Sequence, residues 1–255
     1  MRRWRLPILL LLGAALAGAL GCRSIRAPTA GTLLIGVRAD APPLCFRAKG
    51  QWQGVEVELG RALAARLNLQ PVFKAYPAED LTDALLNGKV DVIMAGLPIT
   101  PEKRLLMDFA SPYLVSGQAA IVRTPDLPHA NTLIKIRSAR IRIGVLADSP
   151  GADYAARYFT RATRQPFPDA AAAVDALRAG QVDLVVHDAP AAWWLTLRHA
   201  PHLALAPVLF DRVELAWAFR RSSVGLRESA NQALAAWQQD GTLAAILRRW
   251  VPFSS

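Results

Sequence analysis

This 255-residue chain contains few of the side chains that bind transition metals: two cysteines and four histidines. Two cysteines cannot form a metal site without histidine partners at ligand spacing. No such spacing is found among the histidines, which are His129, His187, His199 and His202. We therefore expect no metal site and no cofactor. A disulfide between Cys22 and Cys45 stays open as another use of the two thiols.

The chain also lacks an apolar run long enough to cross a membrane. The N-terminal run, residues 6–20, falls short of the roughly 20 residues that a spanning helix needs, and Pro7 and Gly13 interrupt it. Arginines precede this run and small residues follow it, which is the layout of a secretory signal. Ala17-Gly18-Ala19 offers one cleavage site for that signal.

A second ending of the same signal is Ala19-Leu20-Gly21-Cys22, which is typical of a lipoprotein. In that case residues 1–21 are removed, Cys22 carries the lipid and residues 22–31 form a tether. We favour this interpretation because a free thiol is a liability in an oxidising compartment. It predicts a periplasmic protein tethered to a membrane, in preference to a freely soluble one.

The formal net charge is +10, yet the arginines are scattered and form no long basic run. Aromatic and basic residues do not alternate in the manner of single-strand-binding proteins. Both absences argue against nucleic acid as a partner and favour a generally basic surface that can meet anionic lipid. A general bias of the composition towards arginine explains the charge equally well.

Two stretches of the chain are almost the same: DALLNGKVDVIMAGLP from Asp83 and DALRAGQVDLVVHDAP from Asp175. A second pair, GVRADAP from Gly36 and GVLADSP from Gly144, precedes them in the same order. One such likeness between short apolar segments is common, but two paired likenesses in the same order are not. The repeat therefore indicates two similar α/β lobes.

Apolar periodicity predicts strands and helices in alternation around both repeats. The expected strands are residues 32–37, 70–75, 90–95, 141–145 and 182–186, and the expected helices are residues 55–67, 81–86, 150–159, 170–178, 226–237 and 243–250. Such alternation is typical of a parallel, doubly wound sheet in each lobe.

The last two helices have no counterpart after the second repeat, which indicates that the second lobe is inserted into the first. We expect lobe 1 to comprise residues 32–120 and 216–255, and lobe 2 to comprise residues 121–215. Two extended crossings, near residues 117–123 and 213–219, would then form a hinge with a ligand cleft between the lobes.

The ends of the repeated strands hold the first candidates for a site, because ligands of open α/β sheets bind beyond the carboxyl ends of the strands. Asp91 and Asp183 begin equivalent strands and are expected to be structural. Gly96 and Asp188 end those strands and differ. A carboxylate at position 188 suits an ammonium, through a charge-assisted hydrogen bond worth about 1.5–3 kcal/mol. The alternative is that Asp188 caps the helix that begins near Pro190.

Two helix starts add candidates in the same region. Thr100-Pro101 is typical of a helix N-terminus, and Lys103 and Arg104 follow it, either to pair with an anion or as a solvated surface pair. Ser149 opens another helix, whose N–H groups attract a carboxylate, although the serine can equally be a simple cap.

Larger side chains near these candidates are expected to be structural. His187 is expected to be a partly buried neighbour of Asp188 rather than a base. The tryptophans at positions 193, 194 and 250 are expected to lie in the core rather than to contact ligand.

Four segments together resemble the extracytoplasmic solute-binding protein family 3, the amino-acid-type receptors of ABC importers. They are GVEVELGRALAARLNL, NGKVDVIMAGLPITPEKRLLMDFASPYLVSGQAAIVR, GQVDLVVHDAPAAWWL and ANQALAAWQQDGTLAAILRRWV. The likeness runs from about Thr32 to Val251 and keeps the family's order. It implies the type II periplasmic-binding-protein fold, with two α/β lobes that close on a small ligand and a discontinuous first lobe.

The resemblance also implies positions for a ligand clamp. Asp188 stands where the family places the acceptor for an amino group. Lys103, with Arg104 beside it, stands where an arginine grips the α-carboxylate, and a lysine lacks the bidentate fork of that arginine. Pro98 stands in place of the usual threonine or serine and offers neither a hydroxyl nor an N–H.

Other positions depart further from the family's pattern. Ala41 and Ala78 replace two aromatic residues, and Asp148-Ser149-Pro150 replaces a Gly-Thr-Thr-like turn and adds a negative charge. The frame is kept while the amino-acid clamp is largely rewritten. The resemblance then implies a cationic or amine-bearing solute that is not a standard α-amino acid, or no ligand at all.

We therefore expect a monomeric, non-enzymatic receptor that closes on a small polar, amine-bearing solute and delivers it to an ABC permease. The alternative is a ligand-sensing or regulatory lipoprotein of the same fold. An enzyme such as a small-acid dehydratase is disfavoured. Acid–base groups exist in His187, Asp188, Asp148 and Glu56, but no nucleophile, metal or cofactor motif accompanies them.

Overall fold

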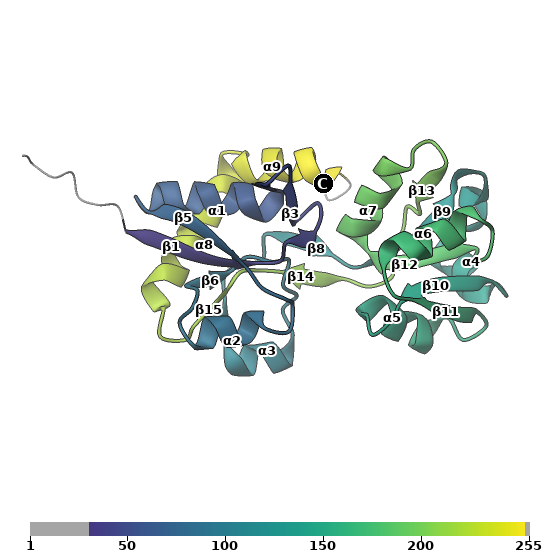
Figure 1. Ribbon diagram of the computed structural model, residues 1–255, viewed down its shortest axis with the longest axis horizontal. Coiled ribbons are helices and arrows are strands. Elements are labelled where there is room, and N and C mark those ends of the chain that lie inside the picture. The colour runs from purple at the N-terminus through teal and green to yellow at the C-terminus, as the bar shows by residue number, and fades with distance from the viewer. Residues whose placement is uncertain (1–30, 253–255) are drawn as a thin grey trace, which may run out of the picture.

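The computed structural model describes residues 31–252, which form two α/β lobes lying end to end (Figure 1). The sheet of the first lobe contains, in spatial order, β5 (Gln70–Ala75), β1 (Thr32–Val37), β6 (Val92–Ile93), β15 (Ala218–Phe219) and β7 (Asp108–Phe109). The sheet of the second lobe contains β11 (Thr163–Phe167), β10 (Arg142–Leu146), β12 (Leu184–Asp188), β9 (Gln118–Arg123) and β13 (Leu203–Leu205).

Helices cover both sheets. The first lobe contains α1 (Val55–Arg66), α2 (Leu81–Leu86), α3 (Pro101–Leu106), α8 (Val224–Gln239) and α9 (Thr242–Trp250). The second contains the 3-10 helix η1 (Thr124–His129), α4 (Leu133–Ser138), α5 (Pro150–Tyr158), α6 (Ala170–Arg178) and α7 (Ala189–Arg198). The helices and strands expected from apolar periodicity are all present, with the strand expected over residues 90–95 reduced to β6.

Both sheets are mixed, which corrects the expectation of purely parallel sheets. β1 pairs in parallel with β5 and β6, as β10 does with β11 and β12. The strands β15 and β9, however, join β6 and β12 antiparallel. An antiparallel strand can enter the sheet from the other lobe without a crossover helix, so helix–strand alternation in the sequence does not reveal it.

A pair of strands connects the lobes. β8 (Leu114–Ser116) and β14 (Val213–Leu215) run antiparallel between the two sheets (Figure 1). The first crossing therefore lies just before residues 117–123, where the sequence placed it, because those residues belong mostly to β9 of the second sheet. Two short paired strands are the geometry of a hinge.

The repeated aspartates have the same structural task in both lobes. The carboxylate of Asp91 accepts the backbone N–H of Leu34 at 3.0 Å, and that of Asp183 accepts the backbone N–H of Arg142 at 2.8 Å. Each aspartate thereby ties the start of one parallel strand to the start of its neighbour. This agrees with the structural role expected for both residues.

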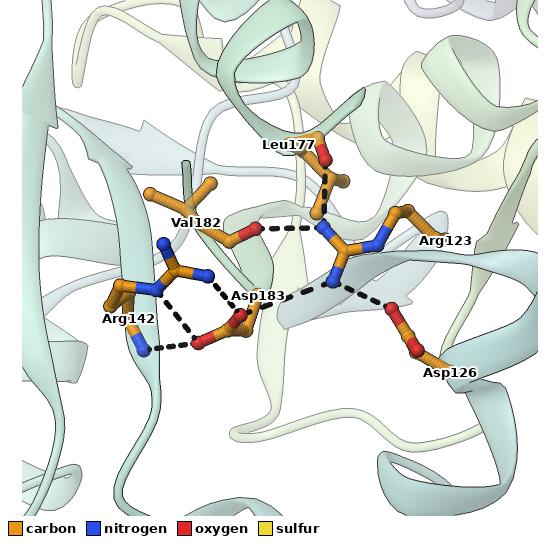
Figure 2. A network of polar contacts seen from close by, with 6 residues as sticks. All are labelled: Arg123, Asp126, Arg142, Leu177, Val182 and Asp183. Atoms are coloured by element: carbon orange, nitrogen blue, oxygen red, sulfur yellow. Dashed lines mark hydrogen bonds and ion pairs between the residues drawn. The ribbon is translucent and has the colours of Figure 1, made fainter. Parts of the chain in front are cut away.

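Each repeat also has an arginine that the sequence analysis did not single out. Arg123 is the last residue of β9 and donates to the carbonyl oxygens of Leu177 and Val182 at 2.8 and 2.9 Å (Figure 2). Arg220 follows β15 and donates to the equivalent carbonyl oxygens, those of Leu85 and Val90. Arg220 also pairs with Asp91 at 3.3 Å. The duplication therefore extends to a third, distant segment of each lobe.

A small antiparallel sheet stands beside the first lobe. It contains β2 (Asp40–Ala41), β3 (Cys45–Ala48) and β4 (Gln51–Gln53). Gly54 then caps α1 with φ 118°, and a Cβ there would lie 2.4 Å from the carbonyl oxygen of Leu44. Only glycine fits this turn into the helix.

Cys45 is buried in the core of the first lobe and forms no disulfide with any described residue, while the alternative of a Cys22–Cys45 disulfide involves a residue that is not described. The other half of that pair, Cys22, lies outside the described residues, as do the expected signal and tether. Between residues 31 and 252, no helix has the length and apolar character needed to cross a membrane.

Candidate functional site

Asp188 lies where the carboxyl end of β12 meets the start of α7. It occupies the N-cap position of α7, but its side chain makes no capping hydrogen bond. The side chain is 49 % exposed. The carboxylate therefore does not cap the N-terminus of α7 and is available to a partner, which argues against the capping alternative.

The charge on Asp188 is favoured by its surroundings. Burial acts to raise the pKa of this carboxyl, but the charge and hydrogen bond of His187, a backbone N–H and the charge of Arg38 outweigh it, so the pKa is lowered. Arg38 follows β1 in the first lobe, so its influence crosses the space between the lobes. The ionised form of Asp188 is thus stabilised in part by a cation of the other lobe.

His187 is tied to Asp188, as expected for a structural neighbour. Its ring nitrogen Nδ1 lies 2.8 Å from the backbone nitrogen of Asp188 and touches the carboxylate oxygen Oδ1 of the same residue. The imidazole is only 16 % exposed. His187 therefore positions the carboxylate rather than facing a ligand.

The helix start at Ser149 is capped. Its hydroxyl accepts the backbone N–H of Ala152 at 3.2 Å and donates to the carbonyl oxygen of Leu146 at 2.7 Å. Both functions of the hydroxyl are thus used within the lobe, as in the capping alternative. Asp148, just before it, is exposed and has a φ of 52°, a conformation that aspartate tolerates in tight turns.

The cations of α3 separate into two environments. Lys103 is half-buried and its Nζ donates to the carbonyl oxygen of Pro98 at 3.5 Å, which holds it beside the segment that follows β6. Burial lowers the pKa of Lys103, against the opposing charge of Glu102. Arg104 is exposed, and its guanidinium has no hydrogen bond or ion pair with any described residue. Lys103 is therefore the better placed of the two.

Gly96 is held from inside the lobe. Its backbone N–H donates to Oε1 of Glu56 at 2.7 Å, so this N–H is not free for a ligand. The residue has a φ of 64°, and a Cβ would come within 2.4 Å of Leu44 Cδ1. Gly96 therefore shapes the end of β6 rather than binding directly.

Glu56 is a buried carboxyl that the sequence analysis considered only as an acid–base group. Besides Gly96 N–H, it accepts the hydroxyl of Tyr113 at 2.7 Å and the indole N–H of Trp217 at 2.9 Å, and it is 0 % exposed. Burial raises its pKa to about 7, although these three donors lower it. On α1, Glu56 shares a face with buried Gly60 and Leu63, and this periodicity is the signal that could have placed it in the core.

Aromatic rings join the two lobes at one side. Trp194 of α7 lies 5.2 Å from Phe46 of β3 and 6.4 Å from Trp250 of α9, between ring centroids. Phe46 and Trp250 are 5.9 Å apart. The expectation that Trp194 lies in a core is therefore wrong, because it is partly buried and its partners belong to the other lobe.

This aromatic contact lies next to the charged groups. Asp40 and Phe46 are register partners in the small sheet, and Asp40 pairs with Arg38 at 3.3 Å. On the other side, Trp194 belongs to the helix that Asp188 begins. The contact therefore places Arg38 and Asp188 on facing surfaces.

The remaining predicted residues are not gathered by direct contact. No hydrogen bond or ion pair within residues 31–252 joins Gly96, Pro98 or Lys103 to Asp148 or Asp188. Two surface depressions, of about 620 and 410 Å³, lie at the outer end of the second lobe and beside the hinge strands; the second is lined by Ile99, next to Pro98, but neither is lined by any of these five residues. The candidates of the first lobe and those of the second are thus not in contact with one another in this structure.

No group of three or more metal-ligating side chains is found in the part of the chain that the structure describes. Of the charged side chains named above, Arg38 and Lys103 of the first lobe are cationic, with Asp40 paired to Arg38, and Asp148 and Asp188 of the second lobe are anionic. Such an arrangement can hold a solute that carries both charges, or a cation against Asp188 alone.

Comparison with known proteins identifies the family to which this chain is similar. Residues 33–253 match the model of the bacterial extracellular solute-binding proteins, family 3. The L-cystine-binding protein TcyJ of Escherichia coli is 27 % identical over 221 residues, which are 86 % of this chain and 82 % of that protein. Most of the similar proteins are binding proteins, but the cyclohexadienyl dehydratase of Pseudomonas aeruginosa is also 24 % identical, over 97 % of this chain and 93 % of its own.

Solved structures agree with the fold. An ancestral arginine-binding protein bound to arginine is similar with a TM-score of 0.69 at 28 % identity, over 88 % of this chain and 99 % of that one. The two mixed sheets are thus those of the type II periplasmic-binding-protein fold. With nearly every described residue inside the family match, the chain belongs to the bacterial extracellular solute-binding proteins, family 3.

Proposed function

We propose that this protein is an extracytoplasmic receptor that binds a small, amine-bearing solute of the amino-acid class for an ABC importer. The observation that carries the proposal is Asp188 at the end of a strand: its carboxylate does not cap α7, and its ionised form is favoured in part by Arg38 of the other lobe. Relatives named for cystine and arginine binding support the amino-acid class. The α-carboxylate of such a solute would meet Lys103 in the first lobe.

Binding would act through the hinge. A solute that contacts Asp188 and Lys103 together contacts both lobes only when they approach, so it stabilises the closed arrangement by its differential affinity. The lysine contributes a point charge rather than a bidentate fork, which lowers the selectivity for an α-carboxylate. We therefore expect amines without an α-carboxylate to bind as well.

Isothermal titration tests the proposal with L-arginine, L-ornithine, L-cystine, putrescine and L-glutamate as probes. Asp188→Asn should weaken the binding of the cationic probes about 10- to 150-fold, the value of one charge-assisted hydrogen bond. Asp153→Asn is a matched control, because Asp153 is an exposed acid of the same lobe. Absence of binding by every probe, or equal binding by both variants, would refute the assignment.

We infer that the protein carries out no chemical step on its ligand. Glu56 is enclosed by three donors inside the first lobe, and among the described residues only the side chain of His187 is in direct polar contact with the carboxylate of Asp188. Neither carboxyl has a serine, threonine or cysteine side chain among its hydrogen-bond partners in the described chain, as activation of such a nucleophile would require. Mass spectrometry of each bound probe after prolonged incubation should show an unchanged mass, and loss of water would contradict this.

We further propose that Cys22 carries a lipid and that residues 22–31 tether the receptor to a membrane. The sequence Ala19-Leu20-Gly21-Cys22 supports this. Mass spectrometry of the exported N-terminus should find an acylated cysteine. A chain that begins between Ala19 and Cys22 with an unmodified thiol would contradict it.

A further inference from the structure

The second lobe has an outer face that is rich in arginine. β10, β11 and β12 begin at this edge of the sheet, and α5, α6 and α7 end there, because helices run opposite to the parallel strands that they connect. The edge lies at the end of the molecule away from the first lobe (Figure 1). We call it the outer face and define its arginines as Arg123, Arg140, Arg142, Arg157, Arg161, Arg164, Arg178 and Arg198.

The acids of the outer face are already neutralised. Asp183 pairs with Arg142 at 2.6 Å and Asp126 pairs with Arg123 at 2.7 Å, as Figure 2 shows. A third acid, Asp175, pairs with Arg178 at 3.5 Å. Each acid of this face therefore already has its own arginine partner.

The other five arginines of the outer face are exposed and have no ion pair with any described residue; they are Arg140, Arg157, Arg161, Arg164 and Arg198. Stabilisation of helix C-termini explains Arg157 and Arg198, which lie in the last turns of α5 and α7. It does not explain Arg140, Arg161 and Arg164, which lie at the starts of β10 and β11.

The opposite edge of the same sheet carries the reverse charge. Asp148, Asp153, Asp169 and Asp188 lie at the carboxyl ends of the strands or at the starts of the helices. The lobe is thus polarised, with acids towards the first lobe and uncompensated arginines outwards. A scattered compositional bias towards arginine would not segregate the charges in this way.

Apolar side chains are exposed on α4 and at the end of α5, where Tyr158 follows Arg157 in the chain. Ile134 of α4 is 80 % exposed and Tyr158 at the end of α5 is 42 % exposed. The guanidinium of Arg137 lies 5.1 Å from the ring of Tyr158 and donates to the hydroxyl of Tyr154, so α4 and α5 are held together. An exposed aliphatic residue and an interfacial tyrosine among arginines suit the boundary between lipid headgroups and acyl chains.

We propose that the outer face of the second lobe docks on an anionic phospholipid surface. The unpaired arginines attract the headgroup phosphates, and Ile134 and Tyr158 enter the interface. Each arginine near an anionic membrane contributes about 1 kcal/mol, which is roughly a fivefold change in partitioning. The docking surface is separate from Asp188 and Lys103, so the solute site and the lipid site are tested independently.

Vesicle co-sedimentation tests the proposal with residues 22–255 carrying Cys22→Ser, which include every described element and no acyl chain. The protein should bind phosphatidylcholine vesicles that contain phosphatidylglycerol and should not bind pure phosphatidylcholine. The triple variant Arg157→Gln, Arg161→Gln, Arg164→Gln should weaken binding about 100-fold, from roughly fivefold per arginine.

A matched control removes the same charge from the first lobe. Lys49→Gln, Arg66→Gln and Arg248→Gln change three exposed cations there, and this variant should lose less than about fivefold. Equal losses in the two triple variants would overturn the proposal, because net charge alone would then explain binding. Failure of the unsubstituted protein to bind the anionic vesicles would overturn it as well.

The contribution of Ile134 to binding distinguishes a membrane from a soluble polyanion as the partner. Ile134→Gln should weaken vesicle binding by severalfold and leave binding to dextran sulfate unchanged. If Ile134→Gln has no effect on vesicles and dextran sulfate binds as tightly as they do, the face is a general polyanion surface and the lipid assignment is wrong. Circular dichroism of each variant checks that the fold is intact.

Discussion

Replacement of Glu56 by glutamine should remove a large pH dependence from the stability of this protein. The carboxyl has a pKa of about 7 in the folded chain, against an ordinary value of 4.5. Because the folded state holds this proton more tightly, the unfolded state is the first to lose it as the pH rises. Stability therefore falls as the pH rises from 4.5 to about 7, and it is fully present below that window.

The size of the effect follows from the shift in pKa. At 1.36 kcal/mol per unit, a shift of this size corresponds to about 3 kcal/mol. Glutamine has nearly the same shape but cannot ionise. The difference in free energy of unfolding between the natural protein and Glu56→Gln should therefore change by about 3 kcal/mol between acid and mildly alkaline pH, to the advantage of glutamine at the higher pH.

Urea unfolding followed by circular dichroism measures this difference at several pH values. The comparison cancels the titration of every group that the two proteins share. Glu79→Gln is the control, since Glu79 is exposed and its replacement should leave the pH profile of the natural protein unchanged. A constant stability difference between the natural protein and Glu56→Gln across the range would refute the reasoning, because Glu56 would then titrate alike in both states.

Two further predictions concern the same region. Burial, and then the charge of Glu56, raise the pKa of the Cys45 thiol to about 12. In the variant Cys22→Ser, the folded protein should therefore not react with Ellman's reagent until it is unfolded. A rapid reaction of the native protein would contradict this. Gly96→Ala should lower the free energy of unfolding by about 2 kcal/mol or more through its positive φ and the contact with Leu44. Gly180→Ala is the control, because Gly180 also has a positive φ, 72°, but no atom lies within 4 Å of the position of an added Cβ. This substitution should lower the free energy of unfolding by only about 1 kcal/mol. An equal loss at both positions would show that Leu44 moves aside freely.

Apolar periodicity and the internal repeat predicted most of the fold. Every expected helix and strand is present, and the repeated aspartates, Asp91 and Asp183, hold equivalent strands. The antiparallel strands β9 and β15 were not recognised as sheet members. A short strand that arrives from the hinge has no helix before it, so its pairing depends on a tertiary arrangement that no local pattern records.

The candidate site was predicted less completely. Asp188 stood out because it differs from its twin, Gly96, at a strand end. Arg38 did not, because its proximity to Asp188 depends on the angle between the lobes. Trp194 was missed for the same reason, since a tryptophan that packs against another lobe has the same local pattern as one in a core. Sequence patterns report what one element buries, but not which separate element covers it.

The aromatic rings that bridge the lobes also provide an intrinsic spectroscopic probe of the angle between the lobes. Trp194 and Trp250 belong to different lobes, with ring centroids 6.4 Å apart. Coupling between indole transition dipoles declines steeply with separation, so a near-ultraviolet dichroism band from this pair would persist only while the two lobes keep this angle. Domain motion could then be followed in real time without an attached dye.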